Sequence, residues 1–221
     1  MDFISFRRFY LDELLAGLSF AGDVADVGGE REKNRGAFCP PIEKVKSWKF
    51  VNIDPATKPD LLGSAENMPA KDASFDYIKI TEVLEHLENP DRALRECFRV
   101  LKPGGTLIAS VPFLFAVHGD PDDYQRWTPS GLKKLLRSAG FDEMNIMPMG
   151  GLVATTCDLF ELYCHHEFTS RGRLRWPHRI LRGLLRKIFL KQLIRSDRNF
   201  PYMATITTGY FIRAKRSVAS I

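Results

Sequence analysis

The sequence predicts an α/β fold, because short apolar strands alternate with amphipathic helices along the chain. Two of these strands end on polar groups, in Phe50-Val-Asn-Ile-Asp54 and Ser74-Phe-Asp-Tyr-Ile-Lys-Ile-Thr-Glu-Val-Leu-Glu-His86. The second is followed by Arg99-Val-Leu-Lys-Pro-Gly-Gly105. In a parallel sheet such strand ends form the ligand crevice, and an acidic residue there can bind a ribose. An enzyme with a nucleotide-type cofactor is therefore the leading hypothesis.

The first half of the chain supplies a helix and four strands. Residues 3–18 are predicted to be a helix, because Phe6, Phe9, Tyr10, Leu14 and Leu18 recur near one face. Pro41 is expected to open a short helix that reaches Trp48. The strands are expected at Val24–Val27, Phe50–Ile53, Asp60–Leu62 and Phe75–Ile80.

The second half continues the alternation. Asn89 is predicted to cap a helix that buries Ala93, Leu94, Cys97, Phe98 and Leu101 and ends at Lys102-Pro-Gly-Gly105. Thr128-Pro129 begins another helix, and Gly140 ends it. Strands are expected at Thr106–Val111, near Asn145–Met149 and at Thr205–Ala214, and helices at 152–168 and 177–195.

Composition fits an ordinary soluble globular protein, with 44% apolar and 27% charged residues in 221. No apolar run is long enough to span a bilayer, and the N-terminus lacks the apolar core of a secretory signal, so we expect a cytoplasmic setting. Cys157 and Cys164 lie near His165 and His166, but on a helix the two cysteines are two turns apart. We therefore predict no metal site.

Motifs in a fixed order resemble those of class I S-adenosylmethionine-dependent methyltransferases. The first is Val24-Ala-Asp-Val-Gly-Gly29, and the others are Asn52-Ile-Asp54, Gly63-Ser-Ala-Glu-Asn-Met-Pro69, Ser74-Phe-Asp76, Glu82-Val-Leu-Glu-His86 and Arg99-Val-Leu-Lys-Pro-Gly-Gly105. They cover about residues 23–141 and are most similar to the broad "type 11" group. The resemblance implies a Rossmann-like, doubly wound, mostly parallel seven-stranded sheet with an antiparallel last strand at Thr205–Ala214.

The same resemblance implies S-adenosylmethionine as cofactor and assigns residues to it. Gly28 and Gly29 after Asp26 would face the methionine part, and Asp54 would bind both ribose hydroxyls, although Asp54-Pro55 is also a common turn. Three further residues, Ser64, Ala65 and Glu66, would border the adenine. Thr81 and Glu82 would lie beneath the sulfonium, whereas Glu85 and His86 are expected to be structural.

Two features depart from the family pattern. Glu30 and Glu32 stand where further glycines are expected, so they must turn outward or pair with Arg31, Lys33 or Arg35. Ser64 replaces the usual adenine-side acid, which leaves a hydrogen bond without charge assistance. These departures keep a non-catalytic alternative open, namely a binding or membrane-associated module. A nicotinamide-dependent oxidoreductase is disfavoured because Gly-x-Gly-x-x-Gly is absent.

The loop after the fifth strand, residues 112–127, is predicted to carry the acceptor chemistry. Its His…Asp-Tyr-x-Arg-Trp pattern is similar to one in methyltransferases of bacterial surface-glycan and small-molecule pathways. His118 is the first choice for general base and Asp123 the second, with Tyr124 and Arg126 orienting the acceptor. The alternative is that the Asp123 and Arg126 charges only fix the loop. The expected reaction is methylation of an oxygen or nitrogen of a small molecule or glycan precursor.

Positive charge is concentrated near the C-terminus. Residues 171–198 have a net charge of +9. Because the whole chain has a net charge of +5, the remaining residues have a net charge of −4. A basic amphipathic stretch at 176–195 fits either an anionic membrane surface or a cap helix with a solvated outer face. Nucleic acid is not expected as a partner, because no aromatic stacking platform accompanies the charge. We predict one domain over 1–221, with an N-terminal helix at 1–20, a core at 23–149, a helical cap insert at 152–200 and a final strand at 204–215.

Overall fold

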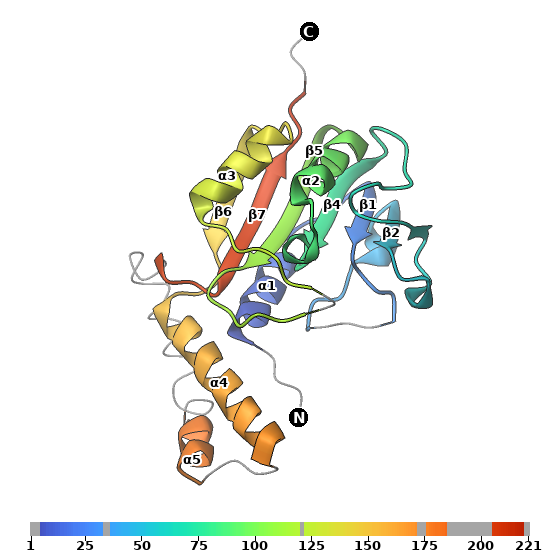
Figure 1. Cartoon of the computed structure of the whole chain (residues 1–221). Helices are drawn as coiled ribbons and strands as arrows, with labels where there is room; N and C mark the ends of the chain where they lie inside the picture. Colours follow the sequence, from blue (N-terminus) through green and yellow to red (C-terminus); the bar gives the residue numbers. More distant parts are fainter. Residues whose placement is uncertain (1–4, 33–35, 120–121, 172–175, 185–204, 219–221) are drawn as a thin grey trace.

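A seven-stranded sheet forms the centre of the molecule in the computed structural model, which describes residues 5–32, 36–119, 122–171, 176–184 and 205–218 (Figure 1). Its strands are β1 (Asp23–Val27), β2 (Ser47–Asn52), β3 (Leu61–Leu62), β4 (Phe75–Thr81), β5 (Leu101–Pro112), β6 (Glu143–Pro148) and β7 (Gly209–Lys215). Their order is β3-β2-β1-β4-β5-β7-β6. Strand β7 lies antiparallel to β5 and β6, while the other pairs are parallel. The predicted fold class is confirmed.

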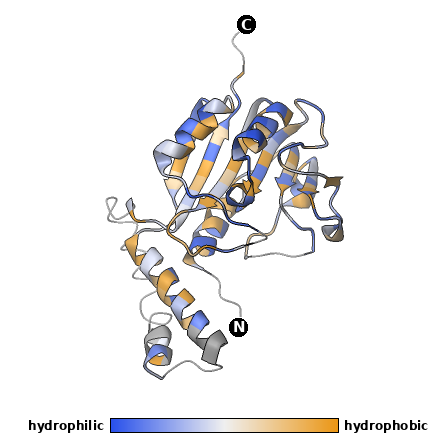
Figure 2. Cartoon of the chain, in the orientation of Figure 1, coloured by the Kyte–Doolittle hydropathy of each residue, from blue (hydrophilic) through white to orange (hydrophobic). Residues whose placement is uncertain are grey.

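Helices cover both faces of this sheet. They are α1 (Phe6–Ala16), α2 (Pro90–Val100), α3 (Pro129–Ser138), α4 (Leu152–Arg171) and α5 (Trp176–Leu184), with 3-10 turns η1 (Ile42–Lys44), η2 (Pro55–Thr57) and η3 (Leu84–His86). The apolar sides of α2 and α3 pack on one face, and α1 packs on the other. Figure 2 shows the apolar residues of the strands sandwiched between these helices.

The face that α1 buries differs from the predicted one. Leu11 and Leu15 are completely buried, whereas Phe9 is 41% exposed. Burying such a leucine contributes roughly 1.5–3 kcal/mol, so these two residues anchor the helix on the sheet.

Three local predictions are wrong. The helix expected between Pro41 and Trp48 is only the turn η1, because β2 already begins at Ser47 and buries Trp48. The Asn89 side chain makes no capping hydrogen bond; its backbone N–H donates to Glu66 instead. The late strand begins at Gly209 rather than at Thr205.

Beyond β6 the chain leaves the sheet. Helix α4 projects away from its lower edge and α5 lies beside α4 (Figure 1), where His178 contacts the rings of Phe160 and Tyr163. None of the described helices is long and apolar enough to cross a bilayer. Residues 185–200 of the predicted cap insert, and with them much of the basic stretch, lie outside the described residues.

Helix α4 is joined to α1 by one buried carboxylate. Asp158 accepts hydrogen bonds from the backbone N–H of Phe6 at 2.6 Å and of Arg7 at 3.2 Å, so it caps the start of α1 from another helix. The Asp158 side chain is fully buried, and this burial raises its pKa from 3.8 to about 6.

The raised pKa predicts a pH-dependent stability. Because Asp158 binds its proton more tightly when folded, its stabilising contribution is complete below about pH 4 and is lost as the pH rises through about 6. The free energy of unfolding of the unaltered protein should therefore fall by about 2 kcal/mol more between pH 4.5 and 7.5 than that of Asp158→Asn. Urea unfolding at both pH values measures this, with Glu43→Gln on the exposed turn η1 as control. Equal pH slopes in the unaltered protein and Asp158→Asn would contradict the assignment.

Candidate functional site

The carboxyl ends of the central strands gather polar residues around one pocket. Gly28 and Gly29 follow β1, Asp54 follows β2, and Glu82 follows β4. Because these strands are parallel, their ends lie at the same edge of the sheet. The pocket encloses about 590 Å³, including its open mouth, and is lined by Arg8, Asp26, Gly28, Gly29, Glu30, Phe38, Pro40, Phe50, Lys79, Thr81 and Glu82.

Both glycines bring bare backbone close to other groups. Gly28 has a φ of +76°, and a Cβ there would lie 2.5 Å from the Val83 Cγ2 methyl. A Cβ on Gly29 would lie 2.5 Å from the carboxylate carbon of Asp26. A side chain at either position would force the loop to shift, so this turn is built for close approach of backbone to a ligand.

Beneath the glycines lies a buried ion pair. Asp26 on β1 and Lys79 on β4 are direct neighbours in the sheet register, and their side chains meet at 2.7 Å between Oδ1 and Nζ. Only 2% of the Asp26 side chain and 11% of the Lys79 side chain are exposed. The pairing compensates both charges in the floor of the pocket.

The acids of the altered glycine loop lie in different surroundings. Glu30 is half-buried and lines the pocket, whereas Glu32 is exposed. Arg31 does not neutralise them in the described contacts, since its guanidinium binds Asp60 at 2.7 and 2.8 Å and lies over the Phe50 ring. Lys33 and Arg35 lie outside the described residues. The cationic side chains that line the pocket are Arg8 and Lys79.

Glu82 is fixed from two sides. One carboxylate oxygen accepts from the Ser110 hydroxyl at 2.8 Å, and the other binds the guanidinium of Arg7 on α1. The Glu82 backbone has a φ of +57°, a left-handed conformation that is strained for a residue other than glycine. Arg7 is itself almost buried and stacks on Phe115 at 4.2 Å. The residue predicted to lie beneath the sulfonium is thus held in place by α1 and β5.

The predicted ribose and adenine residues lie beside the pocket rather than in its lining. Asp54 is exposed just past β2, where Oδ1 caps the turn η2 by accepting from the N–H of Ala56 at 2.8 Å. Ser64 accepts from the N–H of Glu66, Ala65 is buried, and Glu66 accepts from the N–H of Asn89. Asp54 therefore stabilises the turn at Asp54-Pro55, which the sequence offered as the alternative to ribose binding. Only Oδ1 takes part in this cap, and Oδ2 does not.

In the loop after β5, Asp123 is tied to its neighbours. Its side chain is 1% exposed, and both oxygens bind the guanidinium of Arg126, with 2.6 Å between Nη2 and Oδ2. The Asp123 carboxylate also accepts the backbone N–H of His118 at 3.0 Å. Arg126 holds the pKa of Asp123 well below its usual range. These contacts favour the loop-fixing alternative for Asp123 and Arg126.

Tyr124 and His118 lie at the surface side of the same loop. The exposed Tyr124 hydroxyl donates to carboxylates of Glu88 and Asp122. The His118 ring is partly buried, and burial lowers its pKa. Its Nδ1 lies 3.2 Å from both the Ala116 carbonyl and the Asp123 carboxylate.

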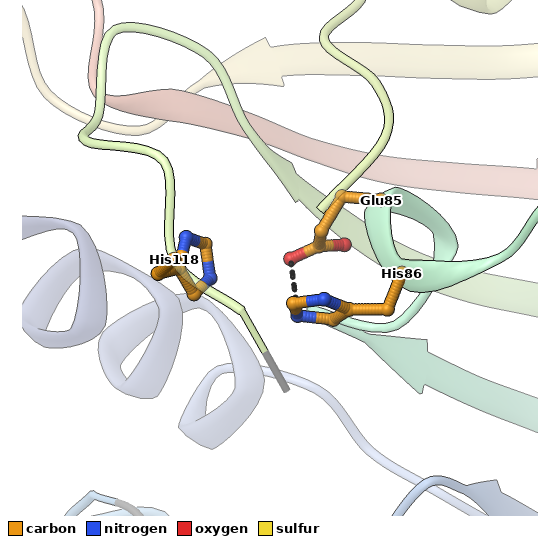
Figure 3. Close-up of side chains that lie close together, drawn as sticks. All are labelled: Glu85, His86 and His118. Atoms are coloured by element: carbon orange, nitrogen blue, oxygen red, sulfur yellow. Dashed lines mark ion pairs between the residues drawn. The ribbon is translucent and has the colours of Figure 1, made fainter. Parts of the chain in front are cut away.

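Glu85 is a buried carboxylate in an unusual environment. It lies in η3, is completely buried, and neither side-chain oxygen has a hydrogen-bond partner. Burial, reinforced by the negative charge of Glu82, raises the pKa of Glu85 to about 8. The adjacent His86 ring faces it, with 3.8 Å between Nε2 and Oε1, and the His118 ring packs edge to face on His86 with 5.1 Å between ring centroids (Figure 3).

Comparison with known proteins agrees with this architecture. A family model described as a methyltransferase domain matches residues 40–109, from the turn before β2 to the middle of β5. Over these residues the chain is similar to methyltransferase domains. The matched segment contains the Asp54, Glu82 and Glu85 positions described above.

Curated relatives match the same region. A probable S-adenosylmethionine-dependent methyltransferase of Mycolicibacterium smegmatis is 35% identical over 86 residues, covering 36% of this chain and 34% of the relative. The ubiquinone/menaquinone biosynthesis C-methyltransferase UbiE of Proteus mirabilis is 34% identical over 122 residues, covering 41% and 49%. The chain therefore spans about a third to a half of the length of these relatives.

Solved structures with the same fold cover nearly the whole chain. A possible histamine N-methyltransferase from Thermotoga maritima superimposes with a TM-score of 0.54 at 21% identity, covering 96% of this chain and 92% of that one. The [4+2]-cyclase SpnF superimposes with a TM-score of 0.60 at 16% identity, covering 95% and 81%. At these identities the likeness shows the shared fold alone, and this fold carries more than one chemistry.

Sequence reasoning missed the residues that α1 contributes. Arg7 and Arg8 were included only in an amphipathic helix, yet Arg7 binds Glu82 and Arg8 lines the pocket. Two adjacent arginines at the start of an amphipathic helix were the available signal. Lys79 was also missed, although a lysine in the middle of a buried strand needs a partner.

The buried Arg7–Glu82 pair yields a stability prediction. Arg7→Met should lower the free energy of unfolding by about 3–5 kcal/mol, because it leaves the Glu82 charge uncompensated beside Glu85. Adding Glu82→Gln should recover part of that loss, and a double-mutant cycle by chemical unfolding measures the coupling. The exposed arginine of α2 serves as the control, in Arg95→Met. Strictly additive losses in the cycle would show that the two side chains do not stabilise each other.

Proposed function

We propose that this chain transfers a methyl group from S-adenosylmethionine to an oxygen or nitrogen of a small-molecule or glycan-precursor acceptor. The observation that carries the proposal is the turn at Gly28 and Gly29, whose bare backbone borders a pocket at the carboxyl ends of the strands. The family match and the relatives support the reaction class.

The pocket residues fit the cofactor's charge pattern. S-adenosylmethionine carries a carboxylate at one end, and the guanidinium of Arg8, which binds Asp12 through Nε, lines the pocket where it can meet that carboxylate; Lys79 is already paired with Asp26. Its sulfonium is positive, and Glu82 supplies a carboxylate nearby in the same lining. Because Arg7 already binds one oxygen of Glu82, the site presents only part of a negative charge and so avoids trapping the sulfonium too tightly.

In this proposal Asp54 binds the ribose of the cofactor. Asp54 is exposed at the end of β2 and uses Oδ1 for the η2 cap, which holds the side chain in a fixed orientation. Its carboxylate is then available to accept hydrogen bonds from ribose hydroxyls, while Ser64, Ala65 and Glu66 border the base.

The acceptor would be bound by the loop after β5. When bound, the cofactor supplies an electrophilic methyl group on its sulfur. The chain must place the acceptor atom in line with that methyl and exclude water. The loop is fixed by the Asp123–Arg126 pair and by the Tyr124 N–H, which donates to the Glu85 carbonyl at 2.8 Å. These contacts give His118 a defined support from which it would meet the acceptor.

Cofactor binding tests the function directly. Titration calorimetry should show S-adenosylhomocysteine binding to the unaltered protein and no binding of NAD. Gly29→Ala should weaken S-adenosylhomocysteine binding by at least tenfold, because the new methyl group must displace Asp26. Gly183→Ala is the matched control, since a Cβ there meets nothing within 4 Å. No binding of either S-adenosyl compound by folded protein would favour the non-catalytic module, while NAD binding would favour the oxidoreductase.

A second variant tests the ribose assignment. Asp54→Asn keeps an oxygen for the η2 cap but removes the charge, so the fold should persist. The affinity for S-adenosylhomocysteine should fall about 10- to 100-fold, as expected when a charge-assisted hydrogen bond worth about 1.5–3 kcal/mol is lost. The comparison variant is Asp72→Asn, an exposed acid before β4 at the other end of the sheet. Unchanged affinity in Asp54→Asn would leave Asp54 with its turn role alone.

A further inference from the structure

Three side chains with metal-binding atoms converge on the acceptor side of the site. Glu85 and His86 come from η3, and His118 comes from the loop after β5, 32 residues further along the chain. One ligand atom from each lies within 4.8 Å of the other two. Figure 3 shows the Glu85 carboxylate directed at the His86 ring, with the His118 ring to one side. The two rings lie edge to face, with 5.1 Å between their centroids.

The carboxylate of Glu85 is the part of this cluster that lacks a hydrogen-bond partner. Its side chain is 0% exposed, and neither oxygen accepts a hydrogen bond. A buried, unpaired carboxylate is costly, and a bound cation is one of the few ways to compensate it. The carboxylate is aimed at His86, whose Nε2 lies 3.8 Å from Oε1.

Both histidines are already oriented as metal ligands are. The Nδ1 atom of His86 hydrogen-bonds the backbone carbonyl of Asp122. The Nδ1 atom of His118 lies 3.2 Å from the Ala116 carbonyl and from the Asp123 carboxylate. An imidazole that donates from Nδ1 to a carbonyl or carboxylate presents a neutral Nε2 with its lone pair free, and such outer partners are typical of metal-binding histidines.

We propose that Glu85, His86 and His118 bind one divalent transition-metal ion, such as Mn²⁺, Fe²⁺, Co²⁺ or Zn²⁺. Two imidazoles and one carboxylate are a donor set that these ions accept while keeping open positions. Donors on one ion, each about 2.1 Å from it, are at most about 4.2 Å apart, so the 3.8 Å between Glu85 and His86 already fits. All three ligand atoms lie within 4.8 Å of one another, so a small closure of the cluster would bring them to one ion.

The surrounding charges favour a cation. The carboxylates of Glu82 and Asp123 are each paired with a guanidinium, that of Arg7 and that of Arg126, so they leave Glu85 as the carboxyl group available to a cation. Side-chain exposure of 14% at His86 and 34% at His118 leaves an entry path from solvent. The open positions of the ion would face this side, where the acceptor approaches.

This site deepens the proposed function, and it rests on that function for its catalytic meaning. An acceptor hydroxyl that binds the ion has a lowered pKa and releases its proton to water. The oxygen lone pair then forms the new bond to the methyl carbon, while the carbon–sulfur bond breaks and its electron pair returns to sulfur. The products are the methyl ether, the neutral thioether and one proton. In this arrangement His118 binds the metal instead of removing the proton, and the acceptor is an alcohol or phenol.

Metal binding is measured first, without cofactor or acceptor. Tag-free protein, stripped with a chelator, is titrated with Mn²⁺ followed by electron paramagnetic resonance and with Co²⁺ followed by visible absorption. One ion should bind per chain. Glu85→Gln and His118→Ala should each weaken binding by at least about tenfold, since losing only an outer partner costs about 10- to 100-fold. His165→Ala, at an exposed histidine of α4, is the control and should leave binding unchanged.

The outcomes separate the metal site from the function. Glu85→Gln replaces a buried carboxyl group by an amide of the same size, so it is expected to fold, and its thermal unfolding curve verifies this. Absence of stoichiometric binding, or equal affinity in Glu85→Gln and His118→Ala, overturns the metal site. Calorimetry with S-adenosylhomocysteine on the metal-free protein tests the cofactor site independently. Cofactor binding without metal binding would reject only the metal site, and metal binding without cofactor binding would reject only the proposed function.

Discussion

The buried ion pair between Arg7 and Glu82 connects the separate parts of this molecule. Glu82 ends β4 in a strained backbone conformation, and Arg7 reaches it from α1 on the opposite face of the sheet. The same guanidinium stacks on Phe115 of the loop after β5. Both charges are largely removed from water, so neither can be lost without leaving the other uncompensated. The position of the Glu82 carboxylate thus depends on a helix more than seventy residues away in sequence.

This dependence makes the site a property of the rigid framework rather than of one loop. Asp26 and Lys79 pair across adjacent strands, which fixes the floor below Gly29. Asp158 of α4 caps α1 and so supports the arginine that binds Glu82. Groups that must meet a ligand with sub-ångström accuracy are best supported by packed helices and strands. The loop after β5 gains comparable definition from the two-oxygen contact between Asp123 and Arg126.

Sequence alone predicted the sheet and the strand ends, because apolar runs and glycine turns are local signals. It could place Gly28, Asp54 and Glu82 at one edge, since parallel strands bring their ends together. It could not show that Arg7 reaches Glu82 or that His118 approaches Glu85, because those contacts depend on how distant segments pack. Asn89 shows a smaller failure of the same kind: its side chain makes no capping hydrogen bond, and its backbone N–H donates to Glu66, a residue from a different part of the chain. The helix expected up to Trp48 does not form, because Trp48 belongs to β2 and its side chain packs in the core.

The place of β7 in the sheet has a consequence for how the protein is made. Strand β7 lies between β5 and β6, although about sixty residues separate it from β6 in the chain. During synthesis on the ribosome, strands β1 to β5, which lie side by side in the order β3-β2-β1-β4-β5, can assemble from a continuous segment that already contains the pocket. The β5 edge must then stay unpaired until Gly209–Lys215 emerges, and β6 has no neighbour before that moment. An open strand edge is the usual starting point of aggregation. The nascent chain is therefore most vulnerable in the interval after its site has formed and before its sheet is closed.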